Sequence, residues 1–215
     1  QQAFSATGGS VAFDIKYYNA YLQDEWRVLP TLTLKAGIRY EVPTGDRLAD
    51  RLDAVLRVIY LVFNEGYDTS SGDALIRREL CAEAIRLGRL VAGLMPDERE
   101  VHGLVALMEI QASRLHSRVG PDGDPVLLMD QDRAKWDSLL IRRGLAALER
   151  AESLGGPLGP YTLQAAIAAC HARARTADAT DWPQIAGLYG ELAASVPSPV
   201  IELNRAIAVS MAFGP

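Results

Sequence analysis

Cysteine and histidine are scarce in this chain, and their spacing excludes several kinds of site. The 215 residues include 2 cysteines, Cys81 and Cys170, and no Cys-x-x-Cys pair, so neither a zinc site nor a disulfide framework is indicated. The 3 histidines form no His-x-x-x-His or His-Glu-x-x-His motif, so a zinc hydrolase is unsupported. We expect no metal and no cofactor. Both cysteines are predicted to be small buried hydrophobic residues.

Excess positive charge and long apolar runs are also lacking. The formal net charge is −5, and nucleic-acid affinity depends on neutralising phosphates with Lys and Arg, so direct DNA or RNA binding is not expected. No apolar run reaches the roughly 18 residues of a spanning helix, and no signal peptide opens the chain. Phosphate-loop, dinucleotide and Gly-x-Ser-x-Gly motifs are missing too. These absences predict a cytoplasmic protein that is not inserted in a membrane.

The chain changes its hydrophobic period near residue 45. From Thr31 to Val42 apolar and polar residues alternate, which predicts a strand. A second alternating run, Val11 to Tyr17, precedes it, and Val28 to Thr31 supplies a turn between them. Residues 1–45 are therefore predicted to contain a β-hairpin.

From Asp46 onward apolar residues recur at steps of three and four, which predicts helices. Asp181 and Ser198 are good N-caps, each followed closely by a proline. The last two helices span about 34 residues, the tetratricopeptide period. We expect a mainly α fold, an antiparallel helical-hairpin (tetratricopeptide-like) array in residues 46–215 with an N-terminal β-hairpin. About seven helices are predicted, over residues 46–64, 73–95, 97–117, 130–154, 160–174, 182–195 and 199–213.

Three motifs carry a resemblance to a known family: Asn64-Glu65-Gly66-Tyr67, Asp130-Gln131-Asp132-Arg133 and Ser198-Pro199-Val200-Ile201-Glu202-Leu203-Asn204-Arg205. With them, residues 43–215 resemble the helical C-terminal extension of a group of extracytoplasmic-function sigma factors. The resemblance implies a regulatory or protein-interaction domain whose partner is RNA polymerase or sigma-factor regions. The promoter-binding regions that precede this extension in the family are missing, so transcription initiation by this chain alone is not predicted.

The segment Tyr21 to Glu41 resembles adjacent barrel strands of TonB-dependent outer-membrane receptors, although any amphipathic hairpin would share this pattern. Two strands cannot close a barrel, so membrane insertion by this chain alone is not expected. The segment is predicted to dock on the helical part or to pair with another chain, and a homo-oligomer could also form through the last helix. The join near residues 41–46 suggests a chimaeric chain or fusion remnant, and the start at Gln1 without Met agrees with a fragment.

Asp130 and Asp132, with Arg133 and Trp136, form the densest polar cluster in the sequence. Two neighbouring carboxylates could act as an acid/base pair or hold a cation. The interpretation that we favour is structural. Asp130 would accept backbone N–H groups as an N-cap, and Arg133 would pair with an acid on a neighbouring helix.

A second polar corner follows the first predicted helix. Glu65 beside Asn64 could serve as a base, but these residues and Tyr67 more simply satisfy the carbonyl groups at the helix end, with Gly66 at positive φ. The alternative to an interaction domain is a hydrolase-like enzyme in which Glu65, Asp130, Asp132 and His171 converge in a pocket between helices. The full set of candidate ligand-binding or structural polar residues is Asn64, Glu65, Tyr67, Asp130, Gln131, Asp132, Arg133, Trp136, Gln164, Asn204 and Arg205.

Overall fold

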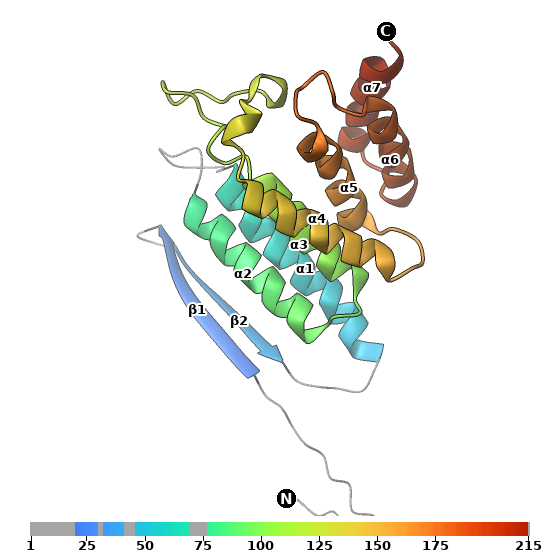
Figure 1. The fold of residues 1–215 in the computed structure, drawn as a ribbon. Coiled ribbons are helices and arrows are strands. Elements are labelled where there is room, and N and C mark those ends of the chain that lie inside the picture. Colours follow the sequence, from blue (N-terminus) through green and yellow to red (C-terminus); the bar gives the residue numbers. More distant parts are fainter. Residues whose placement is uncertain (1–19, 30–31, 41–45, 69–76, 215) are drawn as a thin grey trace, which may run out of the picture. The chain divides into compact units, whose positions relative to one another are not determined.

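The computed structural model describes residues 20–29, 32–40, 46–68 and 77–214, with side chains from residue 51 onward (Figure 1). The chain divides into two units, Gln1–Asp53 and Ala54–Pro215, and each is described by itself.

The first unit contains strands β1 (Ala20–Leu29) and β2 (Leu32–Tyr40), which pair antiparallel. The register runs from Ala20 opposite Tyr40 to Leu29 opposite Leu32, with an irregularity between Arg27 and Leu29. Val28 and Leu29 of the predicted turn belong to β1, and its other two residues lie outside the described residues. The predicted first strand, Val11 to Tyr17, lies outside the described residues.

Helices make up most of the described chain, so the predicted mainly α fold is confirmed. Helices that follow one another pack together: α3 contacts α2 and α4, α5 contacts α4 and α6, and α6 contacts α7, while α3 also contacts α5. The helices are α1 (Asp46–Tyr67), α2 (Arg78–Leu94), α3 (Arg99–Ala112), α4 (Ser138–Ser153), α5 (Pro160–Arg173), α6 (Trp182–Ser195) and α7 (Pro199–Phe213). The last three begin and end within one residue of the predicted bounds.

The predicted helix start at Asp130 is wrong, because α4 begins only at Ser138. Before it the chain forms two short 3₁₀ turns, Leu128–Asp130 and Arg133–Lys135. Trp136 has extended backbone angles, which end the second turn. The side chain of Asp137 then accepts the backbone N–H groups of Leu139 and Leu140 and caps α4.

The predicted left-handed conformation of Gly66 is also wrong. Helix α1 continues through this residue to Tyr67, and Gly66 is not among the glycines with positive φ. A Cβ at Gly66 would lie 2.8 Å from both the Arg77 carbonyl oxygen and the Cys81 nitrogen. Glycine is therefore required here for close approach of α1 to the start of α2, and not for a turn.

Helix α3 is the most buried helix of the second unit, and glycines bring its neighbours close to it. A Cβ on Gly88 of α2 would meet the Met108 methyl group at 2.7 Å, and one on Gly144 of α4 would meet the Ala106 carbonyl oxygen at 3.1 Å. Gly103 of α3 faces Thr162 of α5, whose nitrogen would lie 2.7 Å from an added Cβ. The contact of Gly103 with the backbone of Thr162 leaves no room for a side chain, whereas the Met108 methyl group beside Gly88 belongs to a flexible side chain.

Helix α5 is buried on two sides and joins two parts of the core. Leu107, Ile110 and Leu148 pack with alanines of α5 on one side. Leu163, Ile167 and Cys170 of α5 pack with α6 and α7 on the other. Cys81 and Cys170 are 1% and 4% exposed, which confirms that both are buried.

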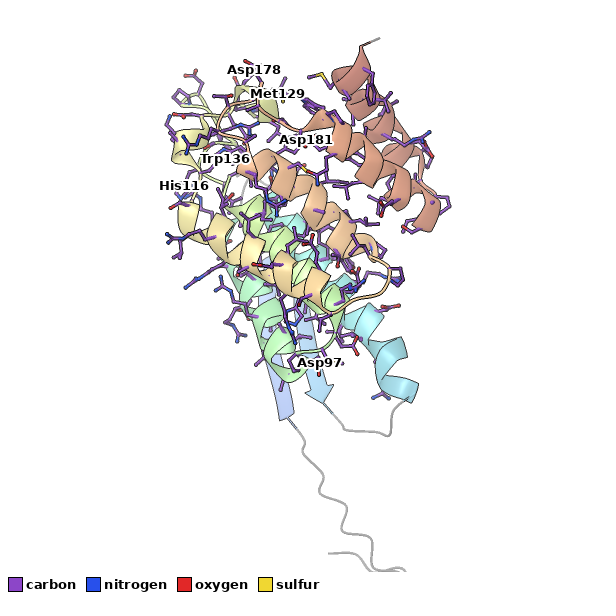
Figure 2. All side chains as sticks on the ribbon, turned by 45° about the vertical axis from the view of Figure 1, so that its right-hand side comes forward. Asp97, His116, Met129, Trp136, Asp178 and Asp181 are labelled. Atoms are coloured by element: carbon purple, nitrogen blue, oxygen red, sulfur yellow. The ribbon has the colours of Figure 1, made fainter. Side chains whose placement is uncertain are left out.

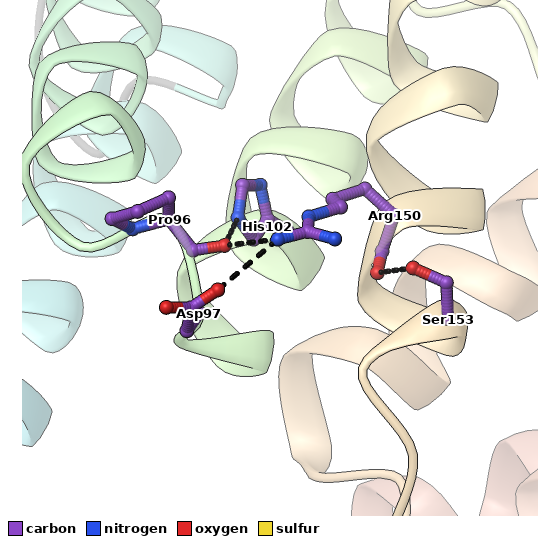
Figure 3. A network of polar contacts seen from close by, with 5 residues as sticks. All are labelled: Pro96, Asp97, His102, Arg150 and Ser153. Atoms are coloured by element: carbon purple, nitrogen blue, oxygen red, sulfur yellow. Dashed lines mark hydrogen bonds and ion pairs between the residues drawn. The ribbon is translucent and has the colours of Figure 1, made fainter.

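Polar contacts join the turn between α2 and α3 to the last turn of α4 (Figure 3). The Pro96 carbonyl oxygen accepts hydrogen bonds from His102 Nε2 at 2.9 Å and from Arg150 Nη2 at 3.0 Å. Arg150 Nη2 also contacts the Asp97 carboxylate at 3.2 Å. This network fixes one end of the α3–α4 pair. Among the helices of the described ranges, none has the length and apolar character needed to cross a membrane.

Replacing Gly103 by Ala is expected to destabilise the second unit, because the added methyl group overlaps the backbone of Thr162. Such overpacking costs about 1–3 kcal/mol. Gly187→Ala in α6 is the matched control, since a Cβ there meets nothing within 4 Å and should be neutral or stabilising by up to about 1 kcal/mol. Urea unfolding followed by circular dichroism measures both. Equal stability of the two variants would contradict the close approach at Gly103.

Candidate functional site

A pocket with a volume of about 290 Å³ lies between α3, α5, α6 and α7. Its apolar lining includes Leu107, Ile167, Leu192 and Ile201. Its polar lining consists of Gln111 from α3, Arg114 from the turn that follows α3, Gln164 and His171 from α5, Tyr189 from α6 and Asn204 from α7. Because these groups come from different elements, only the packing of the helices brings them together.

The pocket contains some of the residues that the sequence nominated and omits the carboxylates. Gln164, His171 and Asn204 line it. Glu65, Asp130 and Asp132 are absent from the lining, and the two aspartates are exposed. No Asp or Glu lines this pocket, so the proposed convergence of carboxylates and His171 does not occur there.

Arg133 links the second 3₁₀ turn to the segment after α5. Its Nη1 donates to the carbonyl oxygens of His171, at 2.6 Å, and Ala174, at 2.8 Å, and its Nη2 donates to the Thr180 hydroxyl at 3.1 Å. The predicted pairing of Arg133 with an acid is therefore wrong. Unpaired carbonyl groups at the C-terminus of α5 carry partial negative charge, so they take the place of a carboxylate.

Trp136 lies beneath this linkage and is 6% exposed. The guanidinium groups of Arg133 and Arg114 lie 5.1 Å and 5.8 Å from the centre of its ring. Trp136 lies in the same segment as Arg133, and Asp181 directly follows Thr180, which Arg133 contacts. Both are labelled in Figure 2. The indole nitrogen is buried without a hydrogen-bond partner, so the aromatic face is what this side chain contributes.

The other acids and amides of the predicted clusters have structural contacts. The Asp132 side chain accepts the Ala134 N–H at 3.0 Å and lies 3.6 Å from the Lys135 ammonium group. Gln131 is buried, and its Nε2 donates to the Val126 carbonyl oxygen. Arg205 forms an exposed pair with Glu202 at 3.0 Å. These contacts stabilise turns and a helix surface.

The Tyr67 corner faces α3 instead of covering the end of α1 as predicted. The Tyr67 hydroxyl donates to Gln111 Oε1 at 3.0 Å and accepts from Arg114 Nη2 at 2.7 Å. The Tyr67 carbonyl oxygen accepts from Arg118, whose guanidinium group lies 3.7 Å from the centre of the tyrosine ring. Asn64 acts through its backbone, accepting from Asp68 N–H at 2.8 Å. The corner therefore builds one wall beside the pocket.

Three arginines, Arg114, Arg118 and Arg133, surround Tyr67 and Trp136 without a carboxylate. None of the ion pairs among the described side chains includes them. Burial lowers the pKa of Arg114, and the positive charges of Arg118 and Arg133 lower it further. The region beside the pocket is therefore electropositive in a chain of net negative charge.

His171 is neutral at pH 7 in this environment. Burial lowers its pKa to about 4, and the charges of Arg114 and Arg133 act in the same direction. Its ring packs edge-on against Trp182, with centroids 5.3 Å apart. Its Nδ1 is buried with no hydrogen-bond partner. His171 therefore contributes an uncharged, largely buried imidazole to the pocket wall.

The sequence interpretation missed the arginines that carry the charge of the site. Arg114 and Arg118 lie in the turns that follow α3, and with Gln111 they are separated by three and four positions in the sequence. That spacing was a usable signal, but the segment was expected only to end the third helix. Glu100 was also missed: its carboxylate accepts the N–H groups of Tyr161 and Thr162 at the start of α5.

Metal binding has no support in the described part of the chain. No group of three or more His, Cys, Asp or Glu side chains there is placed to hold a metal ion. The pocket residues that could contact a ligand are hydrogen-bonding amides, a phenol, a neutral imidazole and one guanidinium group. This donor set suits an anion or a neutral polar group better than a cation.

Replacing Asp137 by Ala is expected to cost about 1 kcal/mol of stability, because two N–H groups at the start of α4 lose their acceptor. Asp130→Ala should change the free energy of unfolding by less than about 0.5 kcal/mol, since that exposed side chain caps nothing. Chemical denaturation of both variants distinguishes the two positions. A larger loss of stability for Asp130→Ala than for Asp137→Ala would contradict this assignment. Asp130 would then be the N-cap, as the sequence predicted.

Replacing His171 by Gln is expected to make the protein less sensitive to acid. The folded-state pKa of His171, about 4, lies below its ordinary value of 6.5, so the unfolded state binds the proton more readily. This contribution to stability is complete above about pH 6.5 and is lost as pH falls toward 4, by on the order of 2 kcal/mol. The measurement is the free energy of unfolding of wild type and variant from pH 7 to 4. Parallel curves would contradict a buried neutral imidazole.

Two family models match separate parts of this chain. Residues 51–152 match a family of unknown function (DUF6596), and residues 2–53 match an outer membrane beta barrel domain. The two matches meet where the structure divides, after Asp53. The helical and N-terminal parts are therefore similar to different families. No activity is assigned by the first match.

One relative extends the similarity through most of the helical unit. An uncharacterized protein of Rhizobium meliloti (strain 1021) is 49% identical over 180 residues, which is 84% of this chain. The chain spans 42% of that protein's length. No solved structure matches the chain. The comparisons thus connect residues 51–152 to a family of unknown function, and the residues before them to an outer-membrane barrel domain.

Proposed function

We propose that residues 46–215 are a tetratricopeptide-like array of helical hairpins that binds a protein partner and regulates it. The observation that carries the proposal is the apolar face of α7. Val200, Leu203 and Ile207 are 65%, 61% and 51% exposed, and Met211 is 49% exposed. Their spacing of three, four and four residues places them on one side of the helix.

An exposed stripe of this kind favours association with a protein surface. Large contiguous apolar patches are uncommon on monomeric soluble proteins. In helical-hairpin arrays each pair of helices buries an apolar face against a neighbouring surface, so the exposed apolar face of α7 is suited to such a contact. The Glu202–Arg205 ion pair lies on the same helix and gives the stripe a polar margin, as at protein interfaces.

The resemblance of residues 43–215 to a sigma-factor extension suggests the partner: RNA polymerase or the promoter-binding regions of a sigma factor. Such a role implies a cytoplasmic location and regulation without direct DNA contact, in agreement with the net charge of −5. We propose that β1 and β2, which resemble strands of TonB-dependent receptors, are a fused remnant outside this interface. The hydrolase alternative lacks support, since the candidate carboxylates do not line the pocket that contains His171.

The test is a binding assay of the full chain with purified core RNA polymerase and with an extracytoplasmic-function sigma factor. Leu203→Glu combined with Ile207→Glu should weaken binding at least tenfold, or about 1.4 kcal/mol, because charges replace buried apolar contacts. The melting temperature should not fall, as both side chains are exposed. Leu61→Glu on α1 is the control, with the same 61% exposure as Leu203.

Three results would count against the proposal. The double variant could bind as tightly as the wild type, the Leu61 control could lose binding equally, or neither partner could bind the wild type. Sedimentation of the wild type and the double variant tests whether the α7 face instead binds a second copy of the chain. A dimer that the α7 substitutions convert to a monomer would assign this face to a second copy of the chain.

A further inference from the structure

The pocket between α3, α5, α6 and α7 has a chemical character that protein docking does not explain. Its polar residues face a cavity of about 290 Å³, near the lower end of the usual range for small-molecule sites. The α7 stripe proposed as a docking face lies mainly on the exposed side of that helix. A ligand in the pocket is therefore a separate question from the partner of the domain, and its answer does not rest on the proposed function.

Arg114 is the charged group of the pocket, and its guanidinium is held in place from several sides. Nη2 is engaged by the Tyr67 hydroxyl and Gln111 Oε1. The ring centres of Tyr67 and Trp136 lie 6.0 Å and 5.8 Å from the central carbon of the guanidinium. Nε and Nη1 make no hydrogen bond to any described residue. They are also not among the polar atoms that are fully buried without a partner. They remain available to an acceptor in the cavity.

Among the described side chains, no acid forms an ion pair with this arginine. Two carboxylates of α3 are engaged elsewhere: Glu109 pairs with Arg89 at 2.7 Å, and Glu100 caps α5. Arg118 and Arg133 add positive charge beside Arg114 instead of removing it. A partly buried guanidinium group without a counter-ion is costly, and an anion that accepts a hydrogen bond from its free Nη1 would reduce that cost.

The remaining polar groups of the pocket are uncharged. Gln111 and Gln164 are hydrogen-bonded to other residues, whereas the side chains of Tyr189 and Asn204 make no hydrogen bond among the described residues. Tyr189 and Asn204 can each donate a hydrogen bond to an anionic ligand or to a hydroxyl group on it. The other walls are aliphatic, formed by Leu107, Ile167 and Leu192, among others, so the remainder of the ligand is apolar.

We infer that this pocket binds a small organic acid, with its carboxylate on Arg114 and an apolar body of one ring or a short aliphatic chain between α5, α6 and α7. The carboxylate accepts from Arg114 Nη1, and Asn204 of α7 and Tyr189 of α6 provide further donors. The charge of the ligand completes the ion pair that the protein lacks. The small volume excludes a nucleotide from this assignment.

The experiment titrates the full chain with benzoate, phenylacetate and hexanoate at pH 7. Each acid is matched by its neutral amide. Calorimetry and the shift in melting temperature report binding. The acids are expected to bind and to raise the melting temperature, and the amides to bind at least tenfold more weakly, because they cannot pair with the guanidinium. If no acid binds at 10 mM (roughly the millimolar limit of a useful affinity), or if amides bind equally well, the inference is wrong.

Two variants assign the binding to this pocket. Arg114→Gln should abolish binding of the acids while Arg142→Gln, an exposed position on α4, should leave it unchanged. If circular dichroism shows that Arg114→Gln is unfolded, Val200→Trp tests whether the acids bind in this pocket. Val200 lines the pocket but is 65% exposed, so a larger side chain can block the cavity without disturbing the core. If folded Arg114→Gln or folded Val200→Trp binds the acids as tightly as the wild type, the inference is wrong.

A peptide with a free C-terminal carboxylate presents the same group, and it serves as the last probe beside its amidated form. Binding of the small acids with no preference for the peptide is the expected result. Binding of the peptide alone would overturn the small-acid assignment and identify a chain terminus as the ligand.

Discussion

The close approach of three helices to α3 is the constraint on which the rest of the helical unit depends. Gly88, Gly103 and Gly144 lie where a neighbouring helix approaches closely, and at Gly103 the facing backbone leaves no space for a Cβ. Because α2, α4 and α5 can approach α3 so closely, the interior is filled by small alanine side chains together with leucine and isoleucine. The position of α5, and therefore of the pocket that it shares with α6 and α7, follows from this packing.

Polar side chains then fix the ends of the packed helices. Glu100 caps the N-terminus of α5 with its carboxylate, and Arg133 satisfies two carbonyl groups at the C-terminus of the same helix. The two charges complement the dipole of α5 at both ends. Arg150 similarly connects α4 to the α2–α3 turn. Charged residues whose partners lie in the backbone of other helices are thus structural here, even where their pattern in the sequence suggested chemistry.

The two units of the chain follow different physical rules. Strands β1 and β2 form one antiparallel pair, and such a pair alone buries little apolar surface. The helical unit has a core that extends across α3, α5 and α6. Similarity to an outer-membrane barrel domain in one part and to a family of unknown function in the other agrees with this difference. Each unit therefore needs its own functional explanation, and the pocket and the α7 face belong to the helical one.

The sequence by itself determined the helices whose signals are local. Period and proline placement located α5, α6 and α7 within one residue, and Asp181 caps α6 as predicted by accepting the Gln184 N–H. Gln164 and Asn204, which the sequence nominated as polar candidates, both line the pocket. These results depend on neighbours within one or two turns of helix, which the sequence contains directly.

Only the tertiary structure decided the roles that depend on distant partners. Asp137 replaced Asp130 as the cap because Trp136 is extended and packs under Arg133, and Gly66 stayed helical because α2 begins against it. Arg133 took carbonyl groups from the end of α5, a choice that no local pattern contains. The lack of a carboxylate near Arg114 is likewise a property of the packed helices. Side chains far apart in sequence compete for the same partner only after folding, so the sequence alone could not assign these contacts.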